Sequence, residues 1–142
     1  DADYSHRFED LANMFKHIDK YEAIIGSRYI EGGNTRGWSY SRKKLSKFAN
    51  IYAKIFTRSD VNDMTSGFRI YSRNALGKIS YNTTLSDGYS FQIEMTVRCE
   101  RENLAIKEVP ITFFERREGK SKMNKKIVFE AIFKVMKFSF RL

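Results

Sequence analysis

Segments with helical and strand-like periodicity alternate along this chain, and the alternation restricts it to folds that combine both kinds of element. Apolar residues that recur every three or four positions predict helices at 8–21, 39–56 and 89–100, and a segment rich in Ile, Val, Phe and Met predicts another at 127–142. Short apolar or alternating runs predict strands at 23–29, 68–71 and 106–114. We therefore predict an α/β fold in which these three strands belong to one mixed sheet.

Individual residues add detail to this prediction. The apolar positions of the first helical segment are expected to form its buried face, and they are Phe8, Leu11, Phe15 and Ile18. Residues 32–34, with two glycines, predict a flexible loop. Pro110 is the only proline, and because it cannot donate a backbone hydrogen bond it favours an edge or irregular position in the last strand.

The composition indicates an anionic partner. The chain has 142 residues, the size of one domain, and its 26 Lys and Arg against 17 Asp and Glu give a net charge of +9. Such a charge suits nucleic acid, a phosphorylated substrate or an anionic membrane surface, and it does not choose among them. The single cysteine, Cys99, excludes an intramolecular disulfide.

The helix predicted at 39–56 is basic and amphipathic. Its apolar side carries Leu45, Phe48, Tyr52, Ile55 and Phe56, and its basic residues are Arg42, Lys43, Lys44, Lys47 and Lys54. Two interpretations stay open: the apolar side packs on the core of the domain, or the helix lies in a membrane interface. No apolar run approaches the roughly 18 to 20 residues that cross a bilayer.

Five motifs follow one another in a specific order. They are "DAD" at 1–3, "GSRYIEGG" at 26–33, "SRKKLSKFAN" at 41–50, "DMTSGFRIYSR" at 63–73 with "GYSFQIEM" at 88–95, and "EVPITFFERREGKSKM" at 108–123. In this order they resemble the polyprenyl-phosphate sugar synthases of glycosyltransferase family 2, most closely the dolichyl-phosphate mannose synthase group. The resemblance covers nearly the whole chain.

The resemblance implies a fold and a domain organisation. Family members have an A-type, Rossmann-like domain in which the Asp-x-Asp motif follows a nucleotide-binding half. Residues 1–142 are therefore expected to be one partial catalytic domain, its C-terminal part, with the nucleotide-binding half absent; no Gly-rich phosphate loop follows a strand here. We expect the chain by itself to be inactive, and to have an exposed sheet edge that a homodimer could cover.

The resemblance also assigns site residues. Asp1 and Asp3 would hold Mg²⁺ or Mn²⁺, with Asp3 also catalytic, since these cations prefer carboxylate oxygens. Relatives often have glutamine where this chain has Ser5, which leaves the third ligand open. The remaining assignments are Asp63, Gln92 and Glu94 as catalytic residues on the donor side, Arg28, Arg42, Ser46 and Arg116 around the acceptor phosphate, and Lys120, Ser121 and Lys122 in the acceptor loop. Without the family, that loop is equally well explained as a solvated charged segment.

The implied function is an inverting transfer of a sugar, expected to be mannose from GDP-mannose, to dolichyl or polyprenyl phosphate. The protein would bind peripherally at the cytoplasmic face of a membrane, without a nucleic-acid partner. An alternative of a different class is a noncatalytic basic module that binds RNA or single-stranded DNA, although no motif with interleaved aromatic residues supports it.

Overall fold

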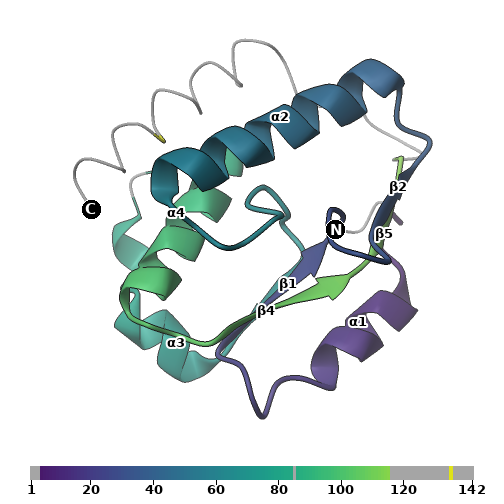
Figure 1. The fold of residues 1–142 in the computed structure, drawn as a ribbon. Helices are drawn as coiled ribbons and strands as arrows, with labels where there is room; N and C mark the ends of the chain where they lie inside the picture. Colours follow the sequence, from purple (N-terminus) through teal and green to yellow (C-terminus); the bar gives the residue numbers. More distant parts are fainter. Residues whose placement is uncertain (1–3, 85, 116–134, 136–142) are drawn as a thin grey trace.

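The structure is a computed structural model that describes residues 4–84, 86–115 and 135. Helices and strands combine as the sequence predicts, which confirms the α/β fold (Figure 1). The helices are α1 (Phe8–Phe15), α2 (Tyr40–Thr57), α3 (Arg73–Lys78), the 3₁₀ turn η1 (Tyr81–Thr83) and α4 (Gly88–Arg101). The strands are β1 (Ala23–Ser27), β2 (Asn34–Arg36), β3 (Arg69–Tyr71), β4 (Ile106–Pro110) and β5 (Thr112–Phe114). Of the helix predicted at 127–142, only Val135 is described, and it is buried.

Three strands form a mixed sheet in the order β3-β1-β4, which confirms the predicted mixed sheet. β1 runs antiparallel to β3 and parallel to β4, with Ile24 opposite both Ile70 and Lys107. β4 is an outer strand and Pro110 is its last residue, in agreement with the edge position expected for proline. β3 is the other outer strand of the described sheet, and a homodimer that covers such an edge stays a prediction.

The single strand predicted at 106–114 is wrong in one respect, because the chain changes sheet within it. At Ile111 the N–H donates to the Ser27 carbonyl at 3.0 Å, while the carbonyl accepts from Asn34 N–H at 2.9 Å. The following strand, β5, then pairs in parallel with β2 in a separate two-stranded sheet, with Thr35 opposite Phe113. The loop predicted at 32–34 is therefore wrong at Asn34, where β2 begins.

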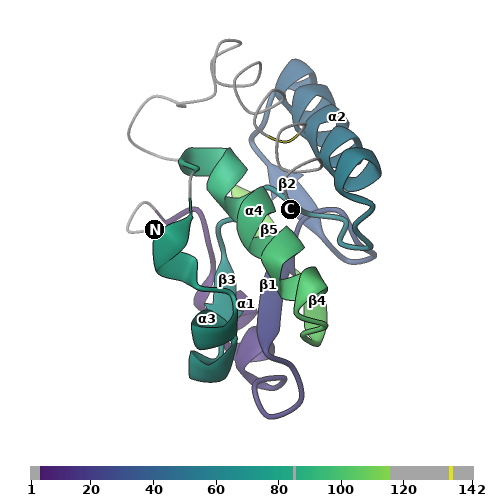
Figure 2. The ribbon, with the colours of Figure 1, turned by 90° about the vertical axis from the view of Figure 1, so that its left-hand side faces the viewer.

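Helices cover both faces of the three-stranded sheet. α1 lies on one face, where Met14 packs with Ile24 and Val109. α3 and α4 lie on the other, where Met95 packs with Ala23 (Figures 1 and 2). α2 extends along one side of the molecule beyond the end of β1, and its Ala53 belongs to a cluster with Ile25, Met64, Ile93 and Val135. The core therefore fixes α2 next to the end of β1.

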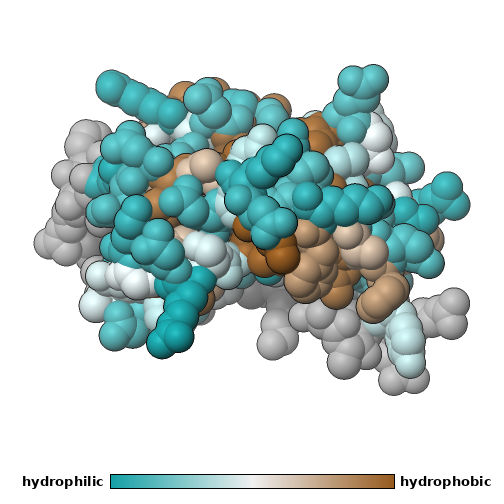
Figure 3. All heavy atoms as spheres, turned by 90° about the horizontal axis from the view of Figure 1, so that it is seen from below, coloured by the Kyte–Doolittle hydropathy of each residue, from teal (hydrophilic) through white to brown (hydrophobic). Residues whose placement is uncertain are grey.

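The predicted buried face of α1 is wrong, because its apolar row is exposed. Phe8 is 80% exposed, Phe15 is exposed, and so is Ile18, which lies beyond the end of the helix; only Leu11 of the predicted face is partly buried. The helix buries Asp10 and Met14 instead, and the Asp10 carboxylate accepts a hydrogen bond from Thr112 N–H at 3.2 Å. Figure 3 shows apolar side chains gathered on the lower face of the molecule, where α1 lies.

α2 matches the predicted helix closely, but most of its apolar row is exposed. The buried residues of α2 are small or polar, namely Ser46, Asn50 and Ala53. By contrast, Ile55 is 67% exposed, and Phe48, Ile51 and Phe56 are exposed too. Of that row, Tyr52 packs against the core cluster and Leu45 is partly buried, so core packing holds for only part of it. Contact of the exposed part with a membrane stays a prediction. Within the described ranges, no helix is both long and apolar enough to cross a bilayer.

Candidate functional site

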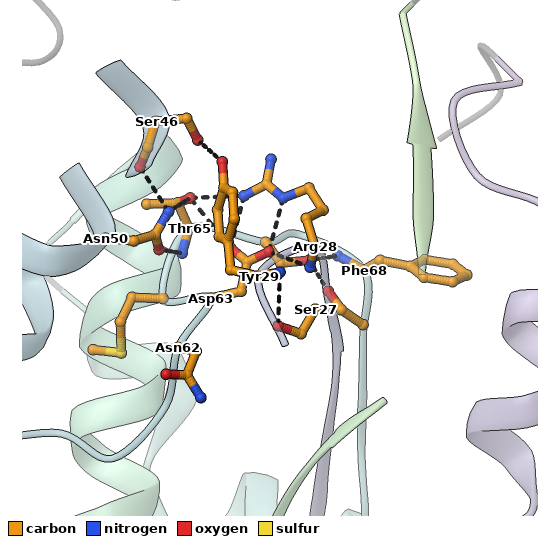
Figure 4. Close-up of polar contacts among 12 residues, drawn as sticks. Ser27, Arg28, Tyr29, Ser46, Asn50, Asn62, Asp63, Thr65 and Phe68 are labelled. Carbon is orange, nitrogen blue, oxygen red and sulfur yellow. Dashed lines mark hydrogen bonds and ion pairs between the residues drawn. The ribbon is translucent and has the colours of Figure 1, made fainter. Parts of the chain in front are cut away.

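Arg28 and Asp63, assigned from sequence to the acceptor and donor sides, form one buried ion pair. Arg28 directly follows β1, and Asp63 lies in the loop between α2 and β3. The Asp63 carboxylate accepts hydrogen bonds from Arg28 Nε and Nη2, both at 2.7 Å, and from the Arg28 backbone N–H at 2.9 Å (Figure 4). Glu108 on β4 holds the loop in position, because its carboxylate accepts from the backbone N–H groups of Asn62 and Asp63.

The environment keeps Arg28 charged. Burial disfavours the guanidinium charge of Arg28, but the hydrogen bonds and the negative charge of Asp63 outweigh it, so the pKa of Arg28 is raised. Nε and Nη2 are occupied by Asp63 and Thr65. Nη1 donates to no side chain or carbonyl in the described part of the chain. One edge of a buried cation is therefore available to a ligand.

A hydrogen-bond network extends from this pair to α2. Thr65 Oγ1 accepts from Arg28 Nη2 at 2.9 Å and from Asn50 Nδ2 at 3.1 Å, and Thr65 N–H donates to Asn50 Oδ1. The Tyr29 hydroxyl donates to Ser46 Oγ at 2.6 Å. Burial raises the pKa of Tyr29, which keeps its phenol a donor. Figure 4 shows Tyr29 directed toward Ser46, so the end of β1 and the middle of α2 are held together.

Arg42 occupies a second position near Arg28, on the first turn of α2. Its guanidinium carbon lies 4.1 Å from the centroid of the Trp38 ring, and the Arg28 guanidinium carbon lies 5.3 Å from the same ring. Arg42 Nη1 forms an ion pair with Glu115, the residue that follows β5. The fold thus brings both arginines to one indole, each with its own carboxylate.

The segment that follows the Asp-x-Asp motif runs past the same aromatic cluster. The Ser5 carbonyl accepts from Phe114 N–H at 3.0 Å, which aligns this segment with β5. His6 stacks on Phe68 with 4.3 Å between ring centroids and meets Phe113 edge-on at 5.1 Å. Phe113 in turn contacts Trp38. Phe113 therefore lies between His6 and the Trp38 ring on which both arginines are placed.

Gln92 and Glu94, predicted on the donor side, point in different directions from α4. A Cβ atom added to Gly67 would lie 3.8 Å from Gln92 Nε2, so the Gln92 amide faces the loop that leads from Asp63 to β3. Glu94 is buried, and its carboxylate accepts two hydrogen bonds from Arg98, at 3.1 and 2.7 Å. The Arg98 guanidinium also binds carbonyls at Ile79 and Thr83, so this pair ties α4 to η1.

A basic cavity of about 480 Å³ opens between α2 and the segments after β1. Its lining includes Arg28, Tyr29, Ile30, Asn34, Thr35, Lys43, Lys47, Asn50, Ile51 and Lys54. Lys54 donates to the Asp60 carbonyl and to Asn62. Lys43 and Lys47 form no ion pair with any described residue, and their charge is therefore uncompensated at this cavity. We call this hollow the α2 cavity.

Several predicted site residues lie outside the described part of the chain. They are Asp1, Asp3, Arg116, Lys120, Ser121 and Lys122. Among the residues that are described, no three His, Cys, Asp or Glu side chains are placed to hold a metal ion together. The metal prediction rests on Asp1 and Asp3 and stays a prediction.

Sequence reasoning missed Trp38, Asn50 and Glu115, which connect the predicted residues to one another. Asn50 had a readable signal, because it follows Arg42 and Ser46 at helical spacing on α2. Glu115 is separated from Arg42 by 73 positions, so no local pattern could pair them. Trp38 lies in the loop before α2, where no helical or strand periodicity identifies a buried residue.

Comparison with known proteins identifies the family of this chain. Residues 1–80 match the family model described as glycosyl transferase family 2. A polyprenol monophosphomannose synthase of Mycolicibacterium smegmatis is 42% identical over 142 residues, 99% of this chain and 54% of the relative. An undecaprenyl-phosphate mannosyltransferase of Micrococcus luteus is 39% identical over 138 residues, 97% of this chain and 57% of the relative. The chain thus spans about half the length of these curated relatives, and it belongs to glycosyl transferase family 2.

Proposed function

We propose that this chain is part of an inverting glycosyltransferase that moves mannose from GDP-mannose to a polyprenyl phosphate at the cytoplasmic face of a membrane. Family membership and the names of the two relatives support the reaction class. They also favour a transferase over the alternative of a basic module that binds RNA or single-stranded DNA. No feature of the described residues supports that alternative.

One observation carries the proposal: Arg28 and Arg42, from two separate motifs, converge on Trp38, and Arg28 also lines the α2 cavity. Lys43 and Lys47 add positive charge to the cavity, and no acidic side chain of the described residues pairs with either lysine. Arginine forks and lysine ammonium groups are the side chains that bind phosphate oxygens best. A phosphate monoester is therefore the ligand that this arrangement fits.

The chemistry needs positioning more than proton transfer. A polyprenyl monophosphate is already ionised near neutral pH, because its second pKa lies near 6. In the proposed step a phosphate oxygen attacks the anomeric carbon as the bond to the diphosphate breaks, which inverts that carbon and releases GDP. Arg28 and Arg42 would fix the attacking group, and the buried Asp63 would fix Arg28.

The proposal includes a divalent cation, because two carboxylates of the Asp-x-Asp motif are suitable ligands for it. Asp1 and Asp3 provide the hard oxygen ligands that Mg²⁺ and Mn²⁺ prefer. Bound there, the cation would neutralise charge on the leaving diphosphate. Gln92, which faces the loop after Asp63, remains our assignment for the donor side.

Membrane association is proposed from the exposed surface of α2. Tyr40, Phe48, Ile51 and Ile55 are exposed along the helix, and Lys44 and Lys47 lie among them. Apolar side chains flanked by lysines suit the boundary between acyl chains and anionic headgroups. Such a position would place the α2 cavity at the surface where the lipid acceptor is found.

A donor screen with the full-length enzyme that carries this chain tests the proposal. Purified enzyme is incubated with polyprenyl phosphate, Mg²⁺ and GDP-mannose, UDP-glucose or UDP-N-acetylglucosamine, and lipid products are identified by mass spectrometry. We expect mannosyl phosphate product from GDP-mannose, lost with EDTA and in Asp3→Ala. Efficient transfer from a uridine donor instead would correct the sugar, and no lipid product from any donor would refute the proposal.

A further inference from the structure

Trp38 is the only tryptophan of the chain, and it lies where the two arginines meet. It precedes Ser39, the N-cap of α2, and it is only 8% exposed. Its ring contacts Phe113 edge-on, with 5.3 Å between centroids, and carries the Arg42 guanidinium at 4.1 Å. The aromatic face stabilises the cation and limits the orientations that Arg42 can take.

This cluster holds buried hydrogen-bond donors that have no acceptor. Among the described buried side-chain atoms, Trp38 Nε1 and Arg42 Nε make no hydrogen bond. Arg28 Nη1, over the same ring, donates to nothing in that part of the chain either. Buried donors in folded proteins are nearly always satisfied, and two of them at one ring, with no acceptor, indicate a ligand that provides acceptor oxygens.

The surrounding charge favours an oxyanion. Trp38 and Arg42 flank the N-terminus of the 18-residue helix α2, whose first turn contains no acidic residue. The helix dipole adds partial positive charge at this end. A dianionic phosphate has both the charge and the tetrahedral set of oxygens that donors from two different side chains require.

The Glu115 carboxylate is the group that a phosphate would displace from Arg42. It is the carboxylate that now binds Arg42, and its side chain is 40% exposed while that of Arg42 is 18% exposed. A pair at the solvent boundary contributes little stability and exchanges readily. An incoming phosphate can therefore take the place of the Glu115 carboxylate on Arg42 and reach the donors behind it.

We propose that Trp38 binds the acceptor phosphate directly, donating a hydrogen bond from Nε1 to a phosphate oxygen while its ring keeps Arg42 oriented toward the same group. The identity of the anion as an isoprenoid monophosphate rests on the proposed function. The hydrogen bond itself requires only a phosphate monoester.

The indole resonance tests the proposal without a substitution. Because the chain has one tryptophan, its ¹H–¹⁵N spectrum contains one indole Nε1–H peak. We expect titration of the ¹⁵N-labelled chain with geranyl monophosphate to move this proton downfield in a saturable manner. Geraniol, which lacks the phosphate, should leave the peak in place, and inorganic phosphate should move it only at higher concentration. A peak that stays fixed at saturation, or that responds to GDP alone, would overturn the proposal.

Two variants separate the hydrogen bond from the packing. Trp38→Phe keeps an aromatic ring for Arg42 and removes the donor, so calorimetry should show geranyl phosphate binding weakened about tenfold, with an unchanged melting temperature. Trp38→Leu also removes the ring and should weaken binding further. Tyr71→Phe, which removes a hydroxyl on β3 bonded to Arg69, is the matched control and should bind as the unaltered chain does.

The outcomes distinguish this proposal from the proposed function. Unchanged affinity in Trp38→Phe would mean that Trp38 only fills space, whatever the enzyme transfers. In the full-length enzyme, Trp38→Phe should raise the KM for polyprenyl phosphate and leave kcat and the KM of the donor nearly unchanged; a lower kcat at constant acceptor KM would contradict it. If the indole peak and Trp38→Phe respond as expected but no sugar is transferred, the phosphate contact stands and the proposed function fails.

Discussion

The surroundings of Arg28 and of Arg42 differ sharply, although the sequence predicts the same role for both arginines. Arg28 is held by Asp63, which is fully buried and accepts three hydrogen bonds from it. Arg42 is held by Glu115 at the solvent boundary, and it stacks on Trp38. One cation is fixed within the protein, whereas the other has a counter-ion that can leave.

The difference indicates a division of labour. A buried pair is costly to break, because removal of one partner leaves an uncompensated charge in a medium of low polarity. An exposed pair contributes little to stability, so its cation can serve a ligand. We therefore expect substitutions around Arg28 to affect folding most, and substitutions around Arg42 to affect acceptor binding most.

Asp63→Ala is expected to have the largest effect. It leaves the Arg28 guanidinium buried without its counter-ion, and the free energy of unfolding should fall by about 3–5 kcal/mol in urea denaturation of this chain. The double variant Arg28→Met with Asp63→Ala removes both charges and should recover part of the loss. A single variant as stable as the unaltered chain would show that Asp63 is not a structural counter-ion.

Arg42→Ala should produce the next largest effect, and on binding rather than folding. Loss of a charge-assisted contact of about 1.5–3 kcal/mol should raise the KM for polyprenyl phosphate roughly 10- to 100-fold in the full-length enzyme. The KM of the sugar nucleotide and the urea midpoint should change little, and Arg42→Lys should recover activity only in part. A weakened donor with an unaffected lipid acceptor would show that Arg42 belongs to the other side of the site.

Glu115→Gln is expected to act in the opposite direction and more weakly. Without the carboxylate, no acidic side chain of the described residues competes with the acceptor for Arg42. An exposed pair is worth about 0.2–1 kcal/mol, so the KM for polyprenyl phosphate should fall by a factor of about 1.5 to 5. A higher KM would mean that Glu115 holds Arg42 in its binding orientation instead of competing with the ligand.

Local pattern predicted the elements of this fold, and it failed where partners lie far apart in the sequence. Periodicity located α2, α4 and the three strands of the main sheet. It failed for α1, where an apolar row is exposed and Asp10 is buried because Thr112, about a hundred residues away, provides the hydrogen bond. It also failed at Ile111, since the change of sheet depends on Ser27 and Asn34.

The candidate site shows the same limit. The motifs assigned Arg28, Arg42 and Ser46 to the acceptor side and Asp63 to the donor side, and the structure brings these four near one another. They did not reveal that Asp63 neutralises Arg28, because a family motif gives residue types without their pairing. Trp38 was missed since a buried donor without a partner is a property of three-dimensional packing alone.

Tyr29→Phe is the smallest change, and it sharpens the description of the Arg28 region as a fixed unit. The substitution removes only the hydrogen bond from the Tyr29 hydroxyl to Ser46 Oγ, so at pH 7 the free energy of unfolding should fall by about 1 kcal/mol.

Burial raises the folded-state pKa of Tyr29 above the ordinary value near 10. The contribution of the neutral phenol is therefore complete below pH 10 and is lost as the pH rises through the folded-state pKa. Urea denaturation at pH 7 and at pH 10.5 should accordingly show a smaller gap between Tyr29→Phe and the unaltered chain at the higher pH, because only the unaltered chain loses this contribution. A gap that widens with pH would mean that the ionised phenol is stabilised beside Arg28, and the Arg28 region would then respond to pH rather than act as a fixed unit.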